Sequence, residues 1–463
     1  MDAALLEWCR RLIECRSVTT EGTRRIAELC AAELLAPAGI TARLVASEHE
    51  GPEQVNLIAI VRGRDPSLRP LLLNTHLDTV PPGTPELWTA CAGDPFRAHI
   101  DGDRIYGLGA ADTKLDFAAK VFALKAAGKP RREVCLIGSF GEEHGLVGAK
   151  ELATAGILPS GALAFVGEPS RLEVITAHKG LMAFELELRF TPARSETPAR
   201  LRRIVVEGKA AHSSTPALGV NAIVAALKSI TASPGRRVAA IFGGSAVNVV
   251  PARCELTLAA QDELSAAGAS ATQAAEIESS TATEFIPTKA LAAIADFVAA
   301  LGAFADRAGS VEPDYAPPTL TSNPGMIRSE RGALRLEFEL RPPPGLTLDA
   351  VRQGLGWLVD ELARANPDLR VELIEKRANP GFRAPAASET VELAMGALAT
   401  AGLPLRAGVK SGCTEAGIYA AAGLEPVVIG PGPSTGVIHA PNEYNFLSEV
   451  DAAVRFYRAL LAM

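Results

Sequence analysis

Several short apolar runs along the chain end abruptly in polar or acidic residues. Continuous runs of this kind, without alternation, are typical of strands buried on both faces of a sheet. The helical stretch from Phe117 to Ala127 suits a crossover between two such strands. The pattern predicts an α/β fold with a mixed, largely parallel sheet flanked by helices. The runs are Leu71–Leu73, Val134–Phe140, Ala162–Val166 and Pro426–Ile429.

The pattern changes between about Ala177 and Arg377. Apolar and polar residues alternate there from Met182 to Phe190 and from Leu334 to Leu340, which predicts half-buried strands. A helix is expected from Gly219 to Thr231. We therefore expect an α+β domain inserted into the first one, because the apolar strand-end runs resume after it. The predicted boundaries are 1–177 and 378–463 for the first domain and 178–377 for the inserted domain.

The segment 261–322 adds length to this insert. Its first part, Glu263 to Ala282, is rich in Ala, Ser, Thr and Glu, and we expect a mobile surface loop. The next part, Thr288 to Gly309, has a helical pattern. At the other end of the sequence, residues 1–17 predict an amphipathic helix and not a signal peptide, because charges interrupt the apolar core.

Composition narrows the function classes. The 463 residues are 48% hydrophobic and 21% charged, as in soluble globular proteins. A formal net charge of −7 gives no indication of the basic surface that binding of nucleic acid requires. No run of about 18 apolar residues predicts a membrane span. The seven cysteines are scattered without paired spacing, which favours reduced thiols and a cytoplasmic enzyme.

Candidate chemistry follows the predicted strands, where ligands of open α/β sheets gather. His76 and Asp78 come directly after the first run; an imidazole and a carboxylate at this spacing suit a metal ligand and its orienting partner. Glu142 and Glu143 are adjacent carboxylates after the second run, which allows one ligand and one acid/base group. Each pair is also compatible with a solvated polar loop.

Three further residues complete a candidate two-metal set. Asp112 lies near two glycines, Glu168 follows a third apolar run, and His439 follows the Gly-Pro-Gly turn at 430–432. Singly, each suits a turn or a structural role. Together, two histidines and three carboxylates suit two divalent cations, whose charge one hydroxide would then balance.

Six ordered motifs give the chain a family resemblance over nearly its whole length. It resembles the di-zinc amidohydrolase and peptidase family that includes acetylornithine deacetylase, succinyl-diaminopimelate desuccinylase and the glutamate carboxypeptidases. The motifs are THLDTVP, YGLGAADTK, GEEHG, GEP, GKAAHSSTP and IHAPNEY. Leu108 and Leu115 depart from the usual pattern around Asp112, but neither position supplies a ligand.

The resemblance implies specific roles for these residues. Asp112 would bridge two ions, most simply Zn²⁺, with Co²⁺ or Mn²⁺ as alternatives. Asp78 would orient His76, and Glu142 would be the general base that passes a proton from water to the leaving amine. The implied ligands are His76 and Glu168 for one ion and Glu143 and His439 for the other.

The resemblance also implies a role for the inserted domain. His212 would donate to the tetrahedral oxyanion, often in the active site of a partner subunit, so a homodimer formed through this domain is expected. Arg341 would bind the substrate carboxylate through two parallel hydrogen bonds. Asn248 would contact the substrate or the intermediate.

Three functions are weighed. The segments Ala177–Gly180 and Cys413–Ala416 resemble the acetylornithine deacetylase branch, which favours a deacylase of N-acyl amino acids. A metallo-dipeptidase or carboxypeptidase acting on small peptides with a free carboxylate is the alternative. A non-catalytic binding protein is disfavoured, because it has no use for Glu142 as a base.

Overall fold

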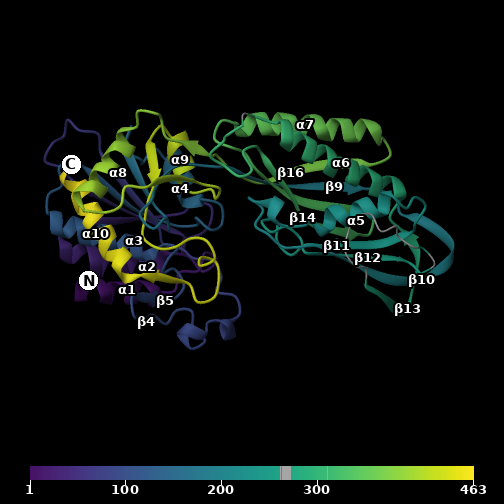
Figure 1. Cartoon of the computed structure of the whole chain (residues 1–463), viewed down its shortest axis with the longest axis horizontal. Helices are drawn as coiled ribbons and strands as arrows, with labels where there is room; N and C mark the ends of the chain where they lie inside the picture. The colour runs from purple at the N-terminus through teal and green to yellow at the C-terminus, as the bar shows by residue number, and fades with distance from the viewer. Residues whose placement is uncertain (261, 263–272, 310) are drawn as a thin grey trace. The chain divides into compact units, whose positions relative to one another are not determined.

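The computed structural model describes residues 1–260, 262, 273–309 and 311–463. Their contacts divide the chain into two units (Figure 1). Unit 1 comprises Met1–His178 and Phe382–Met463, and unit 2 comprises Lys179–Gly381. The two junctions follow residues 178 and 381, where the sequence pattern predicted 177 and 377.

A nine-stranded mixed sheet forms the centre of unit 1, in the order β1-β2-β6-β3-β7-β19-β8-β17, with β18 beside β8. The central strands β6, β3, β7 and β19 are parallel, whereas β1, β2 and β17 pair antiparallel at the margins. The predicted mixed α/β class is confirmed, with its parallel pairs gathered mainly at the centre. The strands are β1 Ala42–Ala46, β2 Val55–Val61, β3 Leu71–His76, β6 Val134–Ser139, β7 Leu163–Gly167, β8 Val174–His178, β17 Phe382–Arg383, β18 Ala407–Lys410 and β19 Glu425–Val428.

Helices cover both faces of this sheet because successive side chains of each buried strand point to opposite sides. Leu71 and Leu73 join a core with α1, α2, α3, α8 and α10, and Leu72 joins a second core with α4 and α9. A separate small sheet has the strand order β20-β5-β4. The remaining elements are α1 Ala3–Glu14, α2 Arg24–Leu29, η1 Cys30–Leu35, η2 Ala36–Ala38, η3 Pro85–Leu87, η4 Thr89–Cys91, β4 His99–Asp101, β5 Arg104–Tyr106, α3 Lys114–Ala127, α4 Val147–Thr154, α8 Glu389–Thr400, α9 Ala416–Ala421, β20 Tyr444–Phe446 and α10 Leu447–Ala462.

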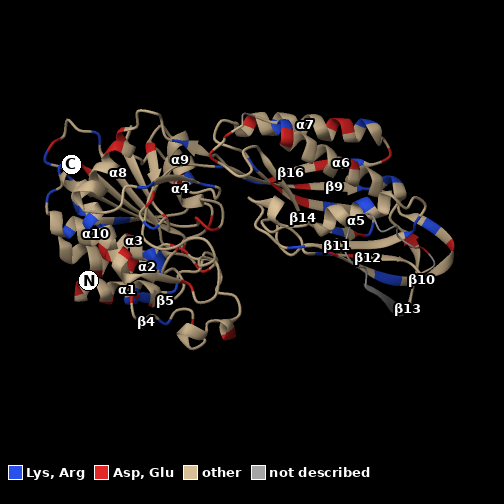
Figure 2. Ribbon diagram, in the orientation of Figure 1, with Lys and Arg blue, Asp and Glu red and all other residues tan. Residues whose placement is uncertain are grey.

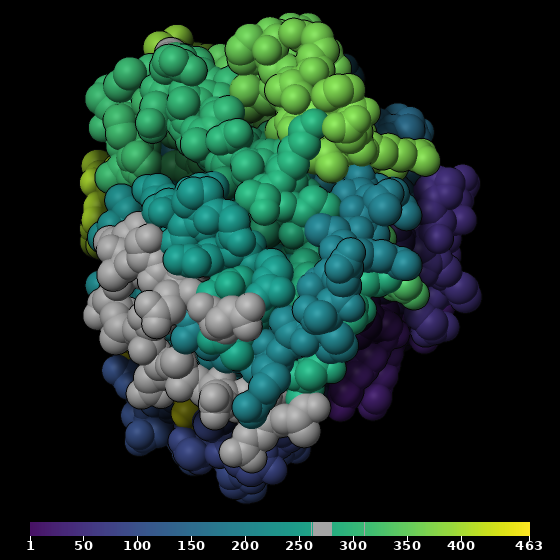
Figure 3. Space-filling model, turned by 90° about the vertical axis from the view of Figure 1, so that its right-hand side faces the viewer, coloured from purple at the N-terminus to yellow at the C-terminus, as the bar shows by residue number. Residues whose placement is uncertain are grey.

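Unit 2 is built on an eight-stranded sheet in the order β13-β10-β12-β11-β14-β15-β9-β16. Its neighbouring strands all pair antiparallel. Figure 3 shows one face of this unit as a teal and green surface. The elements are β9 Leu181–Arg189, β10 Ala193–Glu207, η5 Pro216–Leu218, α5 Ala222–Thr231, β11 Val238–Gly243, β12 Arg253–Ala259, β13 Gln273–Phe285, α6 Thr288–Arg307, β14 Thr321–Glu330, β15 Ala333–Arg341, α7 Leu348–Ala365 and β16 Arg370–Asn379.

The two faces of this sheet differ in chemistry. Even-numbered residues of β9 and β15, such as Leu186 and Leu336, are buried in a core with α5, α6 and α7. Odd-numbered residues of the same strands are largely charged, and Figure 2 shows acidic and basic residues along the strands of this unit. We call this second side of β9 and β15 the charged face. Its residues are Glu185, Glu187, Arg189, Arg335, Glu337, Glu339 and Arg341.

One expectation within the insert is wrong in part. The proposed mobile loop from Glu263 to Ala282 includes residues 273–282, which belong to β13 and pair with β10. Residues 263–272 lie outside the described part of the chain. Pairing with a distant strand overrides local composition here.

The added helix is present as α6. Its length and apolar composition would suit a membrane span, the one such helix among the described residues. However, it packs into the unit 2 core through residues that include Leu291, Ile294 and Leu301.

Candidate metal centre

The predicted strand-end residues converge at one edge of the unit 1 sheet. His76 is the last residue of β3, Glu142 and Glu143 follow β6, and Glu168 follows β7. These three strands are neighbours and run parallel, so their carboxyl ends meet at the same edge. Fully buried strands fix the backbone up to the point where each side chain leaves it.

Asp112 lies between the two histidines. One oxygen, Oδ1, lies 3.1 Å from Nε2 of His76. The other, Oδ2, lies 3.2 Å from Nε2 of His439, which is also 3.1 Å from Oε1 of Glu143. One carboxylate therefore faces two nitrogen donors with two different oxygens, the arrangement that a bridging ligand needs.

The candidate ligands form two groups around this carboxylate. In each group, one ligand atom per residue lies within 4.8 Å of the others. Glu142 belongs to the first group, so its position is compatible with a ligand as well as with a base beside the site. The groups are His76, Glu142 and Glu168, and Asp112, Glu143 and His439.

Asp78 connects two of the converging loops. Its carbonyl oxygen lies 3.1 Å from Nδ1 of His76, and its carboxylate Oδ1 lies 3.6 Å from the same nitrogen. The carboxylate also accepts hydrogen bonds from the backbone N–H groups of Glu142 and Glu143, at 3.2 and 3.3 Å. Thr19 donates its hydroxyl to Oδ2 at 2.7 Å. Asp78 thus holds both the imidazole and the acidic loop, a role wider than the predicted one.

Glu443 fixes the loop of Asp112 and was missed in the sequence. Its Oε1 accepts the backbone N–H groups of Ala111 and Asp112, at 2.9 and 3.0 Å. Burial and the negative charge of Asp112 raise the pKa of Glu443 to about 8, against these hydrogen bonds. Its place in the IHAPNEY motif, four residues after His439, was the available signal.

Burial and like charge govern the acidic groups. Burial raises the pKa of Glu142 well above its ordinary value, and the negative charge of Glu168 raises it further. Burial likewise raises the pKa of Glu143, against the hydrogen bond with His439. Burial opposes ionisation of Asp112 too, but hydrogen bonds with His439 and His76 outweigh it and lower its pKa. The cluster therefore concentrates negative charge that a cation would stabilise.

Neighbouring carboxylates raise the pKa values of the two histidines. Burial favours neutral imidazole, yet hydrogen bonds to Asp112 and Glu143 raise the pKa of His439 to about 11. The pKa of His76 is raised against burial by Asp112 and Asp78. The same negative charge that favours protonation of His76 and His439 would also favour metal cations bound between them and the carboxylates. Imidazole nitrogens and carboxylate oxygens are the donor set of catalytic zinc sites, so the residues fit two divalent ions.

Lys410 is a second residue that the sequence did not reveal. It ends β18, and its Nζ lies 2.8 Å from Oε2 of Glu168. Burial disfavours its charge, but the negative charges of Glu168 and Asp112 raise its pKa. One cation therefore already lies on the His76 side of the cluster.

Two segments resemble the deacetylase branch, and His178 of the first contacts the second within unit 1. His178 ends β8, beside β18. Its Nε2 accepts the backbone N–H of Thr414 at 3.3 Å. The ring of His178 also packs edge-on against Phe382, with centroids 4.7 Å apart. These segments therefore belong to one structural feature next to Lys410.

The predicted groups His212 and Asn248 lie side by side in unit 2. The backbone N–H of Ser213 donates to the carbonyl oxygen of Asn248 at 3.0 Å, and both side chains are exposed. The backbone N–H of Ser214 donates to Nδ1 of His212 at 3.1 Å. Because Nδ1 accepts, the proton of the neutral ring lies on Nε2, the form that can donate to an oxyanion.

Arg341 ends β15 and is 5% exposed. Its Nε donates to Oε1 of Glu339 at 2.6 Å. The sequence predicted the arginine but not this acidic partner two residues earlier.

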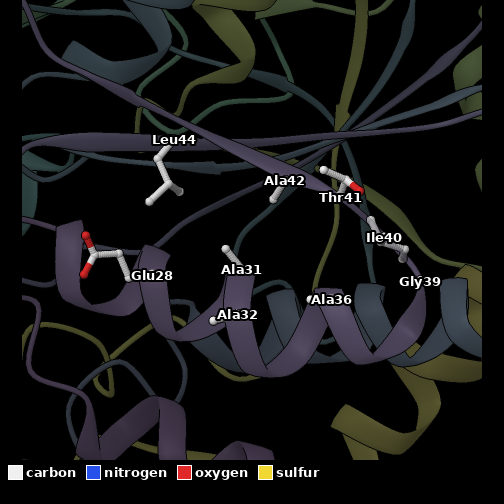
Figure 4. Close-up of a pocket in the computed structure, with 9 residues that line it drawn as sticks. All are labelled: Glu28, Ala31, Ala32, Ala36, Gly39, Ile40, Thr41, Ala42 and Leu44. Carbon is white, nitrogen blue, oxygen red and sulfur yellow. The ribbon is translucent and has the colours of Figure 1, made fainter.

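A groove elsewhere in unit 1 lies between the helical segment of α2, η1 and η2 and the edge strand β1 (Figure 4). Its lining is mostly small or apolar, and Glu28 is its one titratable residue. It therefore offers no alternative set of catalytic groups.

Comparisons with known proteins agree with this geometry. The model of Peptidase family M20/M25/M40 matches residues 72–463. An acetylornithine deacetylase of Myxococcus xanthus is 27% identical over 400 residues, covering 85% of this chain and 80% of that protein. A probable carboxypeptidase of Aspergillus flavus is 29% identical over 287 residues, covering 56% of this chain and 63% of that protein.

A solved structure shares the fold. The aminoacylhistidine dipeptidase of Vibrio alginolyticus matches with a TM-score of 0.68 and 18% identity, over 99% of this chain and 96% of that one. The family model covers most of the chain, including every candidate ligand, and the predicted resemblance is confirmed. The chain therefore belongs to Peptidase family M20/M25/M40 and is a metal-dependent hydrolase.

Proposed function

We propose that the chain cleaves the amide bond of an N-acyl amino acid, as an acetylornithine deacetylase does. The observation that carries the proposal is Asp112, whose two oxygens face His76 and His439 at 3.1 and 3.2 Å. The similarity to the Myxococcus deacetylase and the two deacetylase-like segments support this substrate class. A cytoplasmic role in amino-acid biosynthesis accords with seven free cysteines.

Five residues would hold two divalent ions, most simply Zn²⁺: His76, Asp112, Glu143, Glu168 and His439. When bound, the ions would supply Lewis acidity to the scissile carbonyl and lower the pKa of the attacking water.

Glu142 moves the proton in this proposal. Its carboxylate takes a proton from water and returns it to the leaving amine. Burial favours the protonated form of Glu142, so the group can hold that proton between the two steps. Asp78 keeps the backbone of Glu142 in place through the hydrogen bond at 3.2 Å.

Residues of unit 2 recognise the substrate in this proposal. His212 donates its Nε2–H to the oxyanion that develops on the substrate, a contact worth about 2.7–4 kcal/mol in comparable sites. Arg341 binds the free carboxylate, and Asn248 contacts the substrate beside His212. We also propose a homodimer formed through unit 2, in which β16 is an edge strand of the sheet that the described residues form. Light scattering tests that state.

A metallo-dipeptidase or carboxypeptidase is the second candidate, favoured by the similarity to the Aspergillus carboxypeptidase. A turnover panel of N-acetyl amino acids against dipeptides, with added Zn²⁺ or Co²⁺, separates the two. The deacylase proposal predicts a higher kcat/KM for at least one N-acetyl amino acid than for any dipeptide. Faster cleavage of dipeptides would contradict it.

A further inference from the structure

One carboxylate in unit 2 joins the two substrate-recognition groups. Glu339 is 2% exposed at the end of the charged face. Its Oε1 accepts the Nε–H of Arg341 at 2.6 Å and the hydroxyl of Ser213 at 2.5 Å. Ser213 is the residue after His212. The same oxygen therefore bonds the arginine and the loop that carries the histidine.

The bond to Nε determines how the guanidinium can bind a ligand. Arg341 binds Glu339 through Nε, and no bond from its two terminal nitrogens to a described residue is present. A guanidinium engaged at Nε can still offer Nη1 and Nη2 as a parallel pair to a carboxylate. Glu339 thus fixes the plane of the guanidinium through Nε, and an acidic ligand would meet Nη1 and Nη2.

The second bond reaches the histidine loop. Ser213 is buried, and its backbone N–H donates to Asn248 at 3.0 Å while its hydroxyl donates to Glu339. Asn323 supports the same region from β14, because its Nδ2 donates to the carbonyl oxygens of Val247 and Val249, both at 3.0 Å. The amide of Asn323 thus holds the backbone at 247–249, and the carboxylate of Glu339 holds the hydroxyl of Ser213.

Other acidic residues of the charged face have a different setting. Glu185 and Glu187 are equally buried, but Arg335 bonds both at 3.3 Å and is 31% exposed. Glu187 also pairs with the exposed Arg189 at 2.9 Å. The pairs with Arg335 join β9 to β15, whereas the pair with Arg189 lies within β9, and none of these arginines belongs to the loop of His212.

We propose that Glu339 is a positioning residue that holds Arg341 and the His212 loop in one geometry. The inference rests on the proposed function, and it adds that recognition of the free carboxylate is coupled to donation at the oxyanion. Because both groups share one oxygen of Glu339, a change at this residue disturbs both, whereas a change at Ser213 disturbs only the histidine side.

The test uses the full metal-loaded chain and two matched substrates, an N-acetyl amino acid and its carboxamide. Glu339→Gln removes the charge that orients Arg341, so kcat/KM for the carboxylate substrate should fall roughly tenfold more than for the carboxamide, chiefly through KM. Ser213→Ala should lower kcat for both substrates and leave KM for the carboxylate nearly unchanged. Glu339→Asp should restore part of the preference for the carboxylate.

The matched control is Glu187→Gln, a buried glutamate on the same face, which should leave the preference for the carboxylate unchanged. An equal loss on both substrates in Glu339→Gln, or no loss, would overturn the inference while the wild-type activity upholds the proposed function. If Glu339→Gln does not fold, Glu339→Asp and Ser213→Ala decide the matter by the same split between KM and kcat. A wild-type chain without turnover on acyl amino acids or dipeptides would overturn both proposals.

Discussion

Units 1 and 2 place their charged groups in different ways. In unit 1, like charges crowd at the carboxyl ends of parallel strands, where Glu142 and Glu168 are both buried. In unit 2, charges of both signs lie on one face of an antiparallel sheet and form ion pairs, such as Arg328 with Glu337. Crowded like charges favour the binding of cations, whereas paired opposite charges neutralise one another. The candidate metal ligands therefore all lie in unit 1, and the proposed function gives unit 2 the groups that bind the substrate.

Strand direction explains this difference. Parallel neighbours such as β3 and β7 end at the same edge, so residues far apart in sequence converge there. Antiparallel neighbours such as β9 and β15 end at opposite edges, so their charged residues are distributed along a face.

The largest effect is expected at Glu142, the crowded carboxylate without a ligand role in this account. Glu142→Ala should lower kcat about 10²–10⁴-fold, because a general base is lost, while two metal ions per chain remain bound. His144→Ala, an exposed neighbour in the same loop, is the control and should leave turnover unchanged. Kinetics and elemental analysis of both variants provide the measurement. Loss of metal from Glu142→Ala would instead make Glu142 a ligand.

The next effect concerns stability and contrasts a buried with an exposed ion pair. In unit 1, Asp116 bonds Lys120 at 2.6 Å and accepts the hydroxyls of Thr75 and Tyr457, both at 2.7 Å. Asp116→Ala leaves the buried charge of Lys120 without its acidic partner and should lower the free energy of unfolding by about 3–5 kcal/mol.

The matched change in unit 2 is Arg352→Met, which removes an exposed pair with Glu375. It should cost about 0–1 kcal/mol. Urea unfolding of both variants checks the contrast. Equal losses of unfolding free energy in the two variants would show that the buried ion pair stabilises the protein no more than the exposed one.

A smaller effect depends on pH. Burial raises the pKa of Glu415 from 4.5 to about 7, although its bond with Ser139 acts against this. Between these values the folded state therefore binds more protons at Glu415 than the unfolded state does. The stability that this group contributes is lost as pH rises from about 4.5 to 7.

Glu415→Gln should remove this dependence. Relative to the wild type, its free energy of unfolding should increase by on the order of 1 kcal/mol per pH unit from about pH 4.5 to 7. Denaturant unfolding at pH 5 and pH 7 measures the difference. A constant difference between the two proteins would contradict the raised pKa.

The smallest effect is expected at Lys410, the cation that lies within the crowded region. Lys410→Met removes a positive charge 2.8 Å from Glu168, so metal affinity on the His76 side should rise about tenfold. Chelator competition measures it, without reference to turnover. A fall in affinity would mean that Lys410 orients Glu168 for its ligand.

The sequence predicted the central strands better than the edges. Runs such as Leu71–Leu73 are buried on both faces and therefore read as continuous apolar stretches. Edge strands such as β1 and β17 are short or half-exposed and carry no such pattern. Residues 273–282 were predicted as a loop because their pairing with β10 depends on a segment that is distant in the sequence.

The candidate site follows the same rule. His76 and Glu168 were visible because His76 ends a buried strand and Glu168 directly follows one. Lys410, Glu443 and Glu339 were missed because their roles arise from contacts with remote residues. A single lysine or glutamate has no periodicity or spacing that distinguishes it from a solvated one.

The most direct test of the account counts metal ions on the purified chain and on Asp112→Ala. Elemental analysis after equilibration with Zn²⁺ should find two ions per chain in the wild type and fewer than one in the variant, with both chains folded by circular dichroism. Two ions retained in Asp112→Ala, or fewer than two in the wild type, would contradict a pair of cations bridged by this carboxylate.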